Sequence, residues 1–161
     1  MTGRNRLIFL GAIILAMLAV VVYIQTANGS DLPEVVAERQ EAMKSLGGHM
    51  KAIGQSLESG SPDGALIAEH ASGIAAVGGK IPELFPAGRR LEEGDGKVGA
   101  KPAIWEDWPG FEEAANRLVL EANALTAVAE SGDATAIQAA FKSVGENGCG
   151  GCHTKFRQKV E

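Results

Sequence analysis

The sequence predicts an all-α protein, an antiparallel four-helix bundle preceded by an N-terminal signal or anchor helix. Three observations support this fold class. Aromatic side chains make up only 5% of the residues while Ala is abundant, a composition poor in the residues that favour strands. Apolar residues recur at spacings of three, four and seven, which is the period of a helix packed on one face. No run alternates apolar and polar residues for long enough to indicate a strand.

Residues 1–29 have the layout of an export signal. Arg4 and Arg6 open the chain, an apolar run covers 7–23, and small or polar residues lead to Gly29. The apolar run is longer than the core of most signal peptides, so the segment is either cleaved after Gly29 or kept as a membrane anchor. Both alternatives deliver residues 30–161, the predicted bundle domain, to the periplasm.

The charge of the exported part limits its partners. The full chain has 15 basic and 20 acidic residues, and without Arg4 and Arg6 the balance is 13 against 20, a net charge of −7. A negative domain is not expected to bind nucleic acid, whose backbone repels it. It suits a basic partner protein, although charge alone identifies none.

Two helices are expected in the first half of the domain. The first covers 31–57, and a break at 59–62 separates it from a weaker, glycine-containing second helix over 63–79. Pro33 is acceptable because the first helical turn needs no amide donor at that position. The first helix carries one apolar stripe, made of Val36, Met43, Leu46, Met50, Ile53 and Leu57.

A connection over 80–107, rich in Pro and Gly, leads to the second pair of helices. It is longer than most connections in compact domains, so it either covers a site or is slack. The third helix is expected over 108–130 and the fourth over 134–159, with Asp133 as the N-cap of the fourth. Because two of the three connections are short, successive helices should run antiparallel.

The motif that carries chemistry lies near the C-terminus. The only two cysteines form Cys149-Gly150-Gly151-Cys152-His153, a C-x-x-C-H sequence that indicates covalent attachment of a c-type haem. Two thiols three residues apart on a helix can each form a thioether, and the imidazole that follows can ligate the iron. The two glycines would let the porphyrin approach the backbone. We therefore expect one haem c, with His153 as its proximal iron ligand.

Two other interpretations compete for the same residues. An exported C-x-x-C can be a thiol–disulfide oxidoreductase site, but such motifs usually accompany a βαβ pattern, which is missing here. A zinc site would need four ligands, and His49 and His70 offer no paired spacing. A haem would also fill space in the core, because a bundle with so few aromatic side chains would otherwise be poorly packed.

The placement of the motif on the last helix resembles the cytochrome c′ family, including its cytochrome c-556 branch. The similarity extends over essentially the whole exported domain. It is carried by three further stretches: Glu38-Arg39-Gln40-Glu41-Ala42-Met43, Leu84-Phe85-Pro86 and Pro102-Ala103-Ile104-Trp105. The resemblance implies a periplasmic four-helix bundle with one haem of low to moderate potential, often as a homodimer.

The resemblance also suggests roles for three residues around the haem. Cytochrome c′ typically leaves the sixth iron position empty under an apolar side chain, whereas a Met fills it in cytochrome c-556. Met43 stands at that position, as an iron ligand or as an apolar cap. Arg39 would approach a haem propionate, and Arg157, expected one helical turn after His153, would tune the proximal side.

These features lead to three functional hypotheses. The first is electron transfer with redox partner proteins, through a low-spin iron ligated by His153 and Met43. The second is binding of nitric oxide or carbon monoxide at a five-coordinate iron. The third, a thiol–disulfide enzyme, is the weakest, and under the first two the protein is not an enzyme.

Overall fold

The structure is a computed structural model that describes residues 31–87 and 99–158. The expected signal or anchor segment, residues 1–29, lies outside the described residues. Within them, no helix is long and apolar enough to cross a membrane. Residues 36–161 form one compact unit, which holds the bundle.

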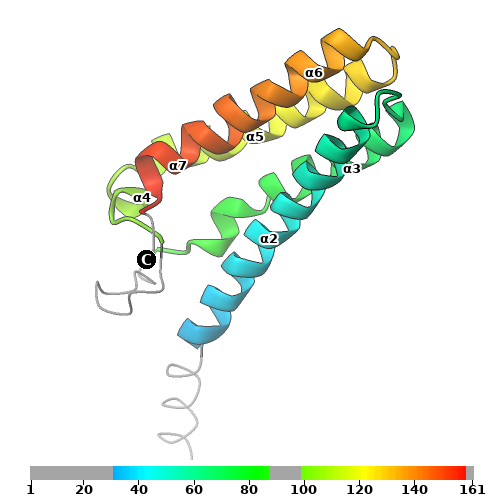
Figure 1. Cartoon of the computed structure of the whole chain (residues 1–161). Coiled ribbons are helices and arrows are strands. Elements are labelled where there is room, and N and C mark those ends of the chain that lie inside the picture. The colour runs from blue at the N-terminus through cyan, green and yellow to red at the C-terminus, as the bar shows by residue number, and fades with distance from the viewer. Residues whose placement is uncertain (1–30, 88–98, 159–161) are drawn as a thin grey trace, which may run out of the picture. The chain divides into compact units, whose positions relative to one another are not determined.

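Four helical rods build the bundle, as predicted (Figure 1). The first two are α2 (Asp31–Glu58) and α3 (Gly64–Gly78). The third is α5 (Trp108–Ala129). The fourth runs through α6 (Ala134–Ser143), the π-helix η2 (Val144–Gly150) and α7 (Gly151–Phe156). The fold class predicted from the sequence is confirmed.

The two tight turns are built in the same way. Asp63 Oδ1 accepts hydrogen bonds from the amides of Ala65 and Leu66 at 3.0 and 3.1 Å, and Asp133 Oδ1 accepts two from the first turn of α6. These carboxylates satisfy amides that a helix start leaves unpaired. The residues Gly60 and Gly132, with φ of +78° and +70°, allow the chain to reverse before each cap. The predicted N-cap at Asp133 is confirmed.

The described parts of the connection between α3 and α5 contain two short helical elements. These are the 3₁₀ turn η1 (Ile81–Leu84) and the short helix α4 (Ala103–Glu106), on either side of the undescribed residues. The indole nitrogen of Trp105 donates a hydrogen bond to the carbonyl of Pro86 at 3.2 Å. The two described halves of the connection are thus held together.

The fourth rod differs from the single helix expected over 134–159. Its middle is π-helical and it ends at Phe156, so the expectation that Arg157 lies on a helical turn is wrong. Arg157 is extended and forms an isolated bridge with Ala100. The flanking bonds, from the amide of Lys101 to Phe156 O at 3.0 Å and from that of Gln158 to Gly99 O at 2.9 Å, tie the end of α7 to the connection. These bonds use backbone groups that another helical turn would need, so the helix ends at Phe156.

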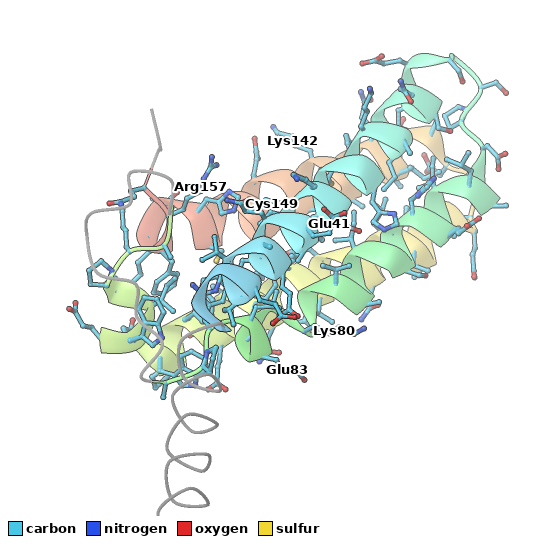
Figure 2. All side chains as sticks on the ribbon, turned by 90° about the horizontal axis from the view of Figure 1, so that it is seen from below. Glu41, Lys80, Glu83, Lys142, Cys149 and Arg157 are labelled. Carbon is cyan, nitrogen blue, oxygen red and sulfur yellow. The ribbon has the colours of Figure 1, made fainter. Side chains whose placement is uncertain are left out.

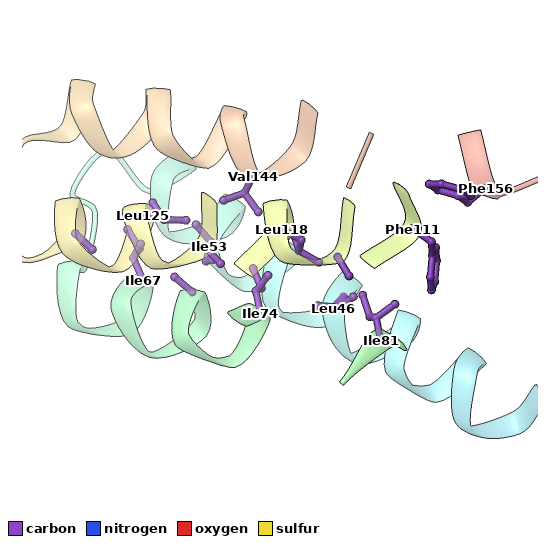
Figure 3. Packing of buried hydrophobic residues seen from close by; sticks show 14 of the residues in the cluster. Leu46, Ile53, Ile67, Ile74, Ile81, Phe111, Leu118, Leu125, Val144 and Phe156 are labelled. Carbon is purple, nitrogen blue, oxygen red and sulfur yellow. The ribbon is translucent and has the colours of Figure 1, made fainter. Parts of the chain in front are cut away.

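The buried core divides into two parts (Figure 3). The first part, which we call the closed end, does not line the large cavity described below and consists of Ile53, Ile67, Ala71, Ile74, Ala122, Leu125, Ala129, Ile137 and Val144. The second part, the cavity end, lines a large cavity and consists of Leu46, Ile81, Phe85, Ile104, Phe111, Ala115, Leu118 and Phe156. Side chains alone therefore fill only one part of the bundle.

Candidate haem site

A cavity of about 580 Å³ lies between α2 and the C-terminal rod. It falls in the range of roughly 300–1,000 Å³ that holds small molecules and cofactors in proteins. All six residues that the sequence analysis singled out line this cavity: Arg39, Met43, Cys149, Cys152, His153 and Arg157. The fold thus brings together two stretches of sequence more than 100 residues apart (Figure 2).

The C-x-x-C-H motif forms one wall. Cys149 belongs to the π-helix and Cys152 to α7, and both are free, half-buried thiols. Regular α-helical spacing between the two cysteines was expected, whereas Cys149 lies in a π-helical turn. Short π segments within helices are frequently found at functional sites.

The electrostatics of the thiols argue against a dithiol enzyme. Burial raises the pKa of the Cys149 thiol, and burial followed by the nearby Cys149 raises that of Cys152. A catalytic C-x-x-C needs the opposite shift, because the thiolate is the nucleophile. Half-buried, protonated thiols fit covalent attachment of a group placed in the cavity better than exchange with solvent disulfides.

His153 can offer a neutral imidazole to a metal. Burial, and after it the charge of Arg157, lowers the pKa of His153 below its ordinary value of 6.5. At neutral pH the ring is therefore uncharged, and one ring nitrogen keeps a lone pair. Arg157 is mostly exposed but lines the same cavity, so it acts on His153 through its charge.

Two polar atoms of the Arg39 side chain at the cavity have no partner among the described residues. Arg39 is 5% exposed, its Nε donates to the carbonyl of Leu84 at 2.5 Å, and its guanidinium lies 4.3 Å from the ring centroid of Phe85. Its Nη1 and Nη2 are buried without a hydrogen-bond partner among the described residues. Burial lowers the pKa of Arg39. Two unpaired donors of a buried cation need an anion, and a carboxylate such as a haem propionate matches their fork.

Apolar groups of α2 form the opposite wall. Met43 and Met50 are half-buried and line the cavity together with Leu46. The thioether of Met43 can therefore face a group bound to the C-x-x-C-H wall, either as a ligand or as an apolar cover. Cavity size, thiols, neutral imidazole and unpaired guanidinium together fit a haem.

One glycine in the motif region has a role that the sequence did not predict. A Cβ built on Gly148 would lie 2.8 Å from Leu118 Cδ1 and 3.3 Å from Leu118 Cα, so α5 and η2 touch there. By contrast, Gly151 is exposed with open space around it, and neither Gly150 nor Gly151 lines the cavity. The close helix–helix contact is thus made at Gly148, and the expected approach of a porphyrin to Gly150 and Gly151 stays a prediction.

Comparisons with known proteins place the chain in a family. The family model described as Cytochrome C′ matches residues 34–157. Cytochrome c′ of Pararhodospirillum photometricum is 35% identical over 127 residues, which cover 78% of this chain and 98% of that protein. Cytochrome c-556 of Agrobacterium fabrum is 32% identical over 125 residues, covering 77% of this chain and 81% of that protein.

Solved structures show the same similarity. A cytochrome c′ described as having an unusual ligand-controlled dimer dissociation superposes with a TM-score of 0.71 at 32% identity, over 81% of this chain and 99% of its own. Cytochrome c′ from Thermochromatium tepidum gives a TM-score of 0.69 at 29% identity, over 80% and 97% of the two chains. The family match over residues 34–157 includes the C-x-x-C-H motif.

Proposed function

Because the chain belongs to the cytochrome c′ family, whose members bind covalent haem c, we propose that Cys149 and Cys152 form its two thioethers and that His153 ligates its iron. The observation that carries this proposal is the single cavity that all three residues line. Haem c supplies an iron centre that exchanges one electron and, where its sixth position is open, binds a small ligand. Arg39 would hold a propionate through its two unpaired donors.

We propose further that the iron is five-coordinate and binds a diatomic gas, nitric oxide or carbon monoxide. Several of the most similar relatives and solved structures are cytochromes c′, which favours the second of the two main hypotheses from the sequence. Met43 and Leu46 would then form an apolar cover over the open position. An apolar cover excludes water and charged ligands while it admits small neutral ones.

Electron transfer is the second candidate, and two observations favour it. A cytochrome c-556 is 32% identical to this chain, and the thioether of Met43 lines the cavity. A sulfur ligand would fill the sixth position and raise the potential of the iron. Both candidates are properties of a haem carrier or gas-binding protein, and neither is a classical enzyme.

We also propose the assembly and location of the protein. The solved cytochrome c′ with ligand-controlled dimer dissociation supports a homodimer whose association responds to the haem ligand. We propose that residues 1–29 are a signal segment and that the bundle works in the periplasm. Sedimentation velocity of the purified protein, with and without carbon monoxide, tests the dimer, since a monomer in both conditions would contradict it.

The optical spectrum of the purified protein distinguishes the two functions. We expect ferric and ferrous spectra of a high-spin haem, and a shift of the ferrous spectrum on addition of carbon monoxide. A low-spin ferrous spectrum, a weak far-red ferric sulfur-to-iron band and little response to the gas would instead assign Met43 as a ligand. Intact mass after denaturation should exceed the chain mass by one haem, because thioethers survive denaturation.

Substitutions at Met43 provide the matched test. Met43→Leu keeps an apolar cover, so we expect an unchanged high-spin spectrum, whereas loss of a sulfur ligand would convert a low-spin spectrum to high spin. Met50→Leu is the control, because Met50 lines the same cavity two helical turns away. Cys149→Ser and Cys152→Ser should each leave one thioether or abolish stable attachment, as seen in the denatured mass.

A further inference from the structure

Two histidines meet outside the haem site. His49 of α2 and His70 of α3 are both half-buried, and their Nδ1 atoms lie 2.9 Å apart. Their ring centroids are 5.2 Å apart and the ring planes are inclined by 59°. Neither residue lines the cavity. The sequence offered no metal-ligand spacing for these two histidines, because they become neighbours only when α2 and α3 pack together.

The neighbouring turn of α3 makes room for the His49 ring. A Cβ built on Gly73 would lie 2.4 Å from His49 Cε1 and 2.7 Å from His49 Nε2. Only glycine at this position allows the ring to lie in its observed place. A glycine inside a helix is less favourable than Ala, so its presence here has a structural cost. The ring of His49 is thus seated against α3 beside His70.

The distance between the two nitrogens suits a shared metal ion. Imidazole nitrogens bind first-row metals at about 2.0–2.1 Å. Two such bonds with the observed separation of 2.9 Å enclose an angle of about 90° at the metal. This is the angle between neighbouring ligands of a square-planar or tetragonal ion, the geometry of Cu²⁺ and Ni²⁺. A tetrahedral ion would need about 3.3 Å.

We propose that His49 and His70 form a binding site for one divalent transition-metal ion, with Cu²⁺ as the tightest, that links α2 to α3. No group of three or more His, Cys, Asp or Glu side chains is placed to hold a metal among the described residues. Water therefore completes the coordination sphere. Cu²⁺ binds nitrogen sites more tightly than Ni²⁺ or Zn²⁺, so it is the ion with the strongest expected affinity.

The proton balance of binding is simple. Between two neutral rings, one Nδ1 donates its hydrogen to the other Nδ1. On binding, the ion takes the place of that hydrogen, and the donor ring exchanges with water to carry its proton on Nε2. Both rings stay neutral and no proton is released overall.

The test uses the haem-loaded protein and Cu²⁺. Equilibrium dialysis should give one bound ion, and electron paramagnetic resonance should show superhyperfine splitting from two nitrogens, at field positions distinct from the ferric haem. Melting temperature should rise with Cu²⁺, because the ion binds only the folded pair. His49→Gln and His70→Gln should each weaken binding by at least about tenfold, the lower end of the loss seen when even indirect ligand contacts are removed.

A pair of glycine substitutions separates ligand geometry from general effects. Gly73→Ala keeps both ligands but fills the place of the His49 ring, so it should weaken Cu²⁺ binding. Gly48→Ala is the same change beside His49, where a Cβ meets nothing within 4 Å, and it should leave binding unchanged.

Three results would overturn the site. One is dialysis that finds equal Cu²⁺ affinity in the wild type and the double variant His49→Gln/His70→Gln. Another is a wild-type resonance spectrum with fewer than two nitrogens. The third is equal affinity in Gly73→Ala and Gly48→Ala. If a histidine variant fails to fold, the wild-type spectrum and the glycine pair still decide.

Discussion

If Arg39 pairs with a haem propionate as proposed, replacing it with Met should destabilise the haem-loaded protein by about 3–5 kcal/mol, the cost of breaking a buried ion pair by removing one partner. The structure supplies the contacts behind this loss, whose separate energies do not simply add. Nη1 and Nη2 lack partners among the described residues, and each charge-assisted hydrogen bond to a carboxylate contributes about 1.5–3 kcal/mol. The guanidinium also lies 4.3 Å from the centroid of Phe85, a contact that contributes about 0.5–2 kcal/mol. The loss is a large share of the roughly 5–15 kcal/mol that holds a domain folded.

Urea unfolding of the purified haem protein, followed by circular dichroism, measures this change. Arg117→Met is the matched control, because Arg117 is 56% exposed and pairs with Glu121 at 3.9 Å across one turn of α5. An exposed pair contributes at most about 1 kcal/mol. Arg39→Lys should recover only part of the loss, since an ammonium lacks the planar fork. If Arg39→Met and Arg117→Met lower the unfolding free energy equally, Arg39 does not hold an anion in the cavity.

Two further perturbations test the packing and the charges around the site. Gly148→Ala should lower the unfolding free energy by about 1–3 kcal/mol, because the added methyl group overpacks against Leu118. Gly151→Ala is the control, since this residue lies in open space and the change should be neutral or stabilising by up to about 1 kcal/mol. Equal urea midpoints for the two variants would contradict the close contact at Gly148. Asp107→Asn should lower the melting temperature at pH 7, because the hydrogen bond from Lys155, followed by one from a backbone amide, lowers the pKa of Asp107 below 3.8. A carboxylate with a lowered pKa stabilises the fold above 3.8 and loses that effect as pH falls through its folded-state value. The difference between variant and wild type should therefore vanish in acid, and a constant difference from pH 7 to pH 2 would refute the assignment.

Much of the fold could be predicted from the sequence because its signals are local. The apolar period gave helices that agree with the structure to within one or two residues for the first three rods. Asp133 could be recognised as a cap because a carboxylate directly before a helical pattern accepts amide hydrogens nearby. The C-x-x-C-H motif indicated haem c because covalent attachment of that cofactor needs two cysteines and a histidine at this spacing.

Other features could not be predicted because they depend on contacts between distant segments. The pairing of Lys101 with Phe156 ends α7 earlier than expected. The apolar periodicity of the last rod does not indicate this end. The π-helix Val144–Gly150 likewise has no apolar repeat of its own from which it could be predicted. His49 and His70 become neighbours only across the interface of α2 and α3.

The division of the core into a closed end and a cavity end has a consequence for the order in which the protein matures. The closed end buries its apolar side chains against one another, so it can hold α3, α5 and α6 together before any cofactor arrives. The cavity end has no such filling, and its backbone should open by local unfolding at far lower cost. Amide hydrogen exchange in the haem-free chain should therefore be slow around Leu125 and fast around Cys149. A haem-free chain would then present its two thiols for attachment while the closed end is already folded.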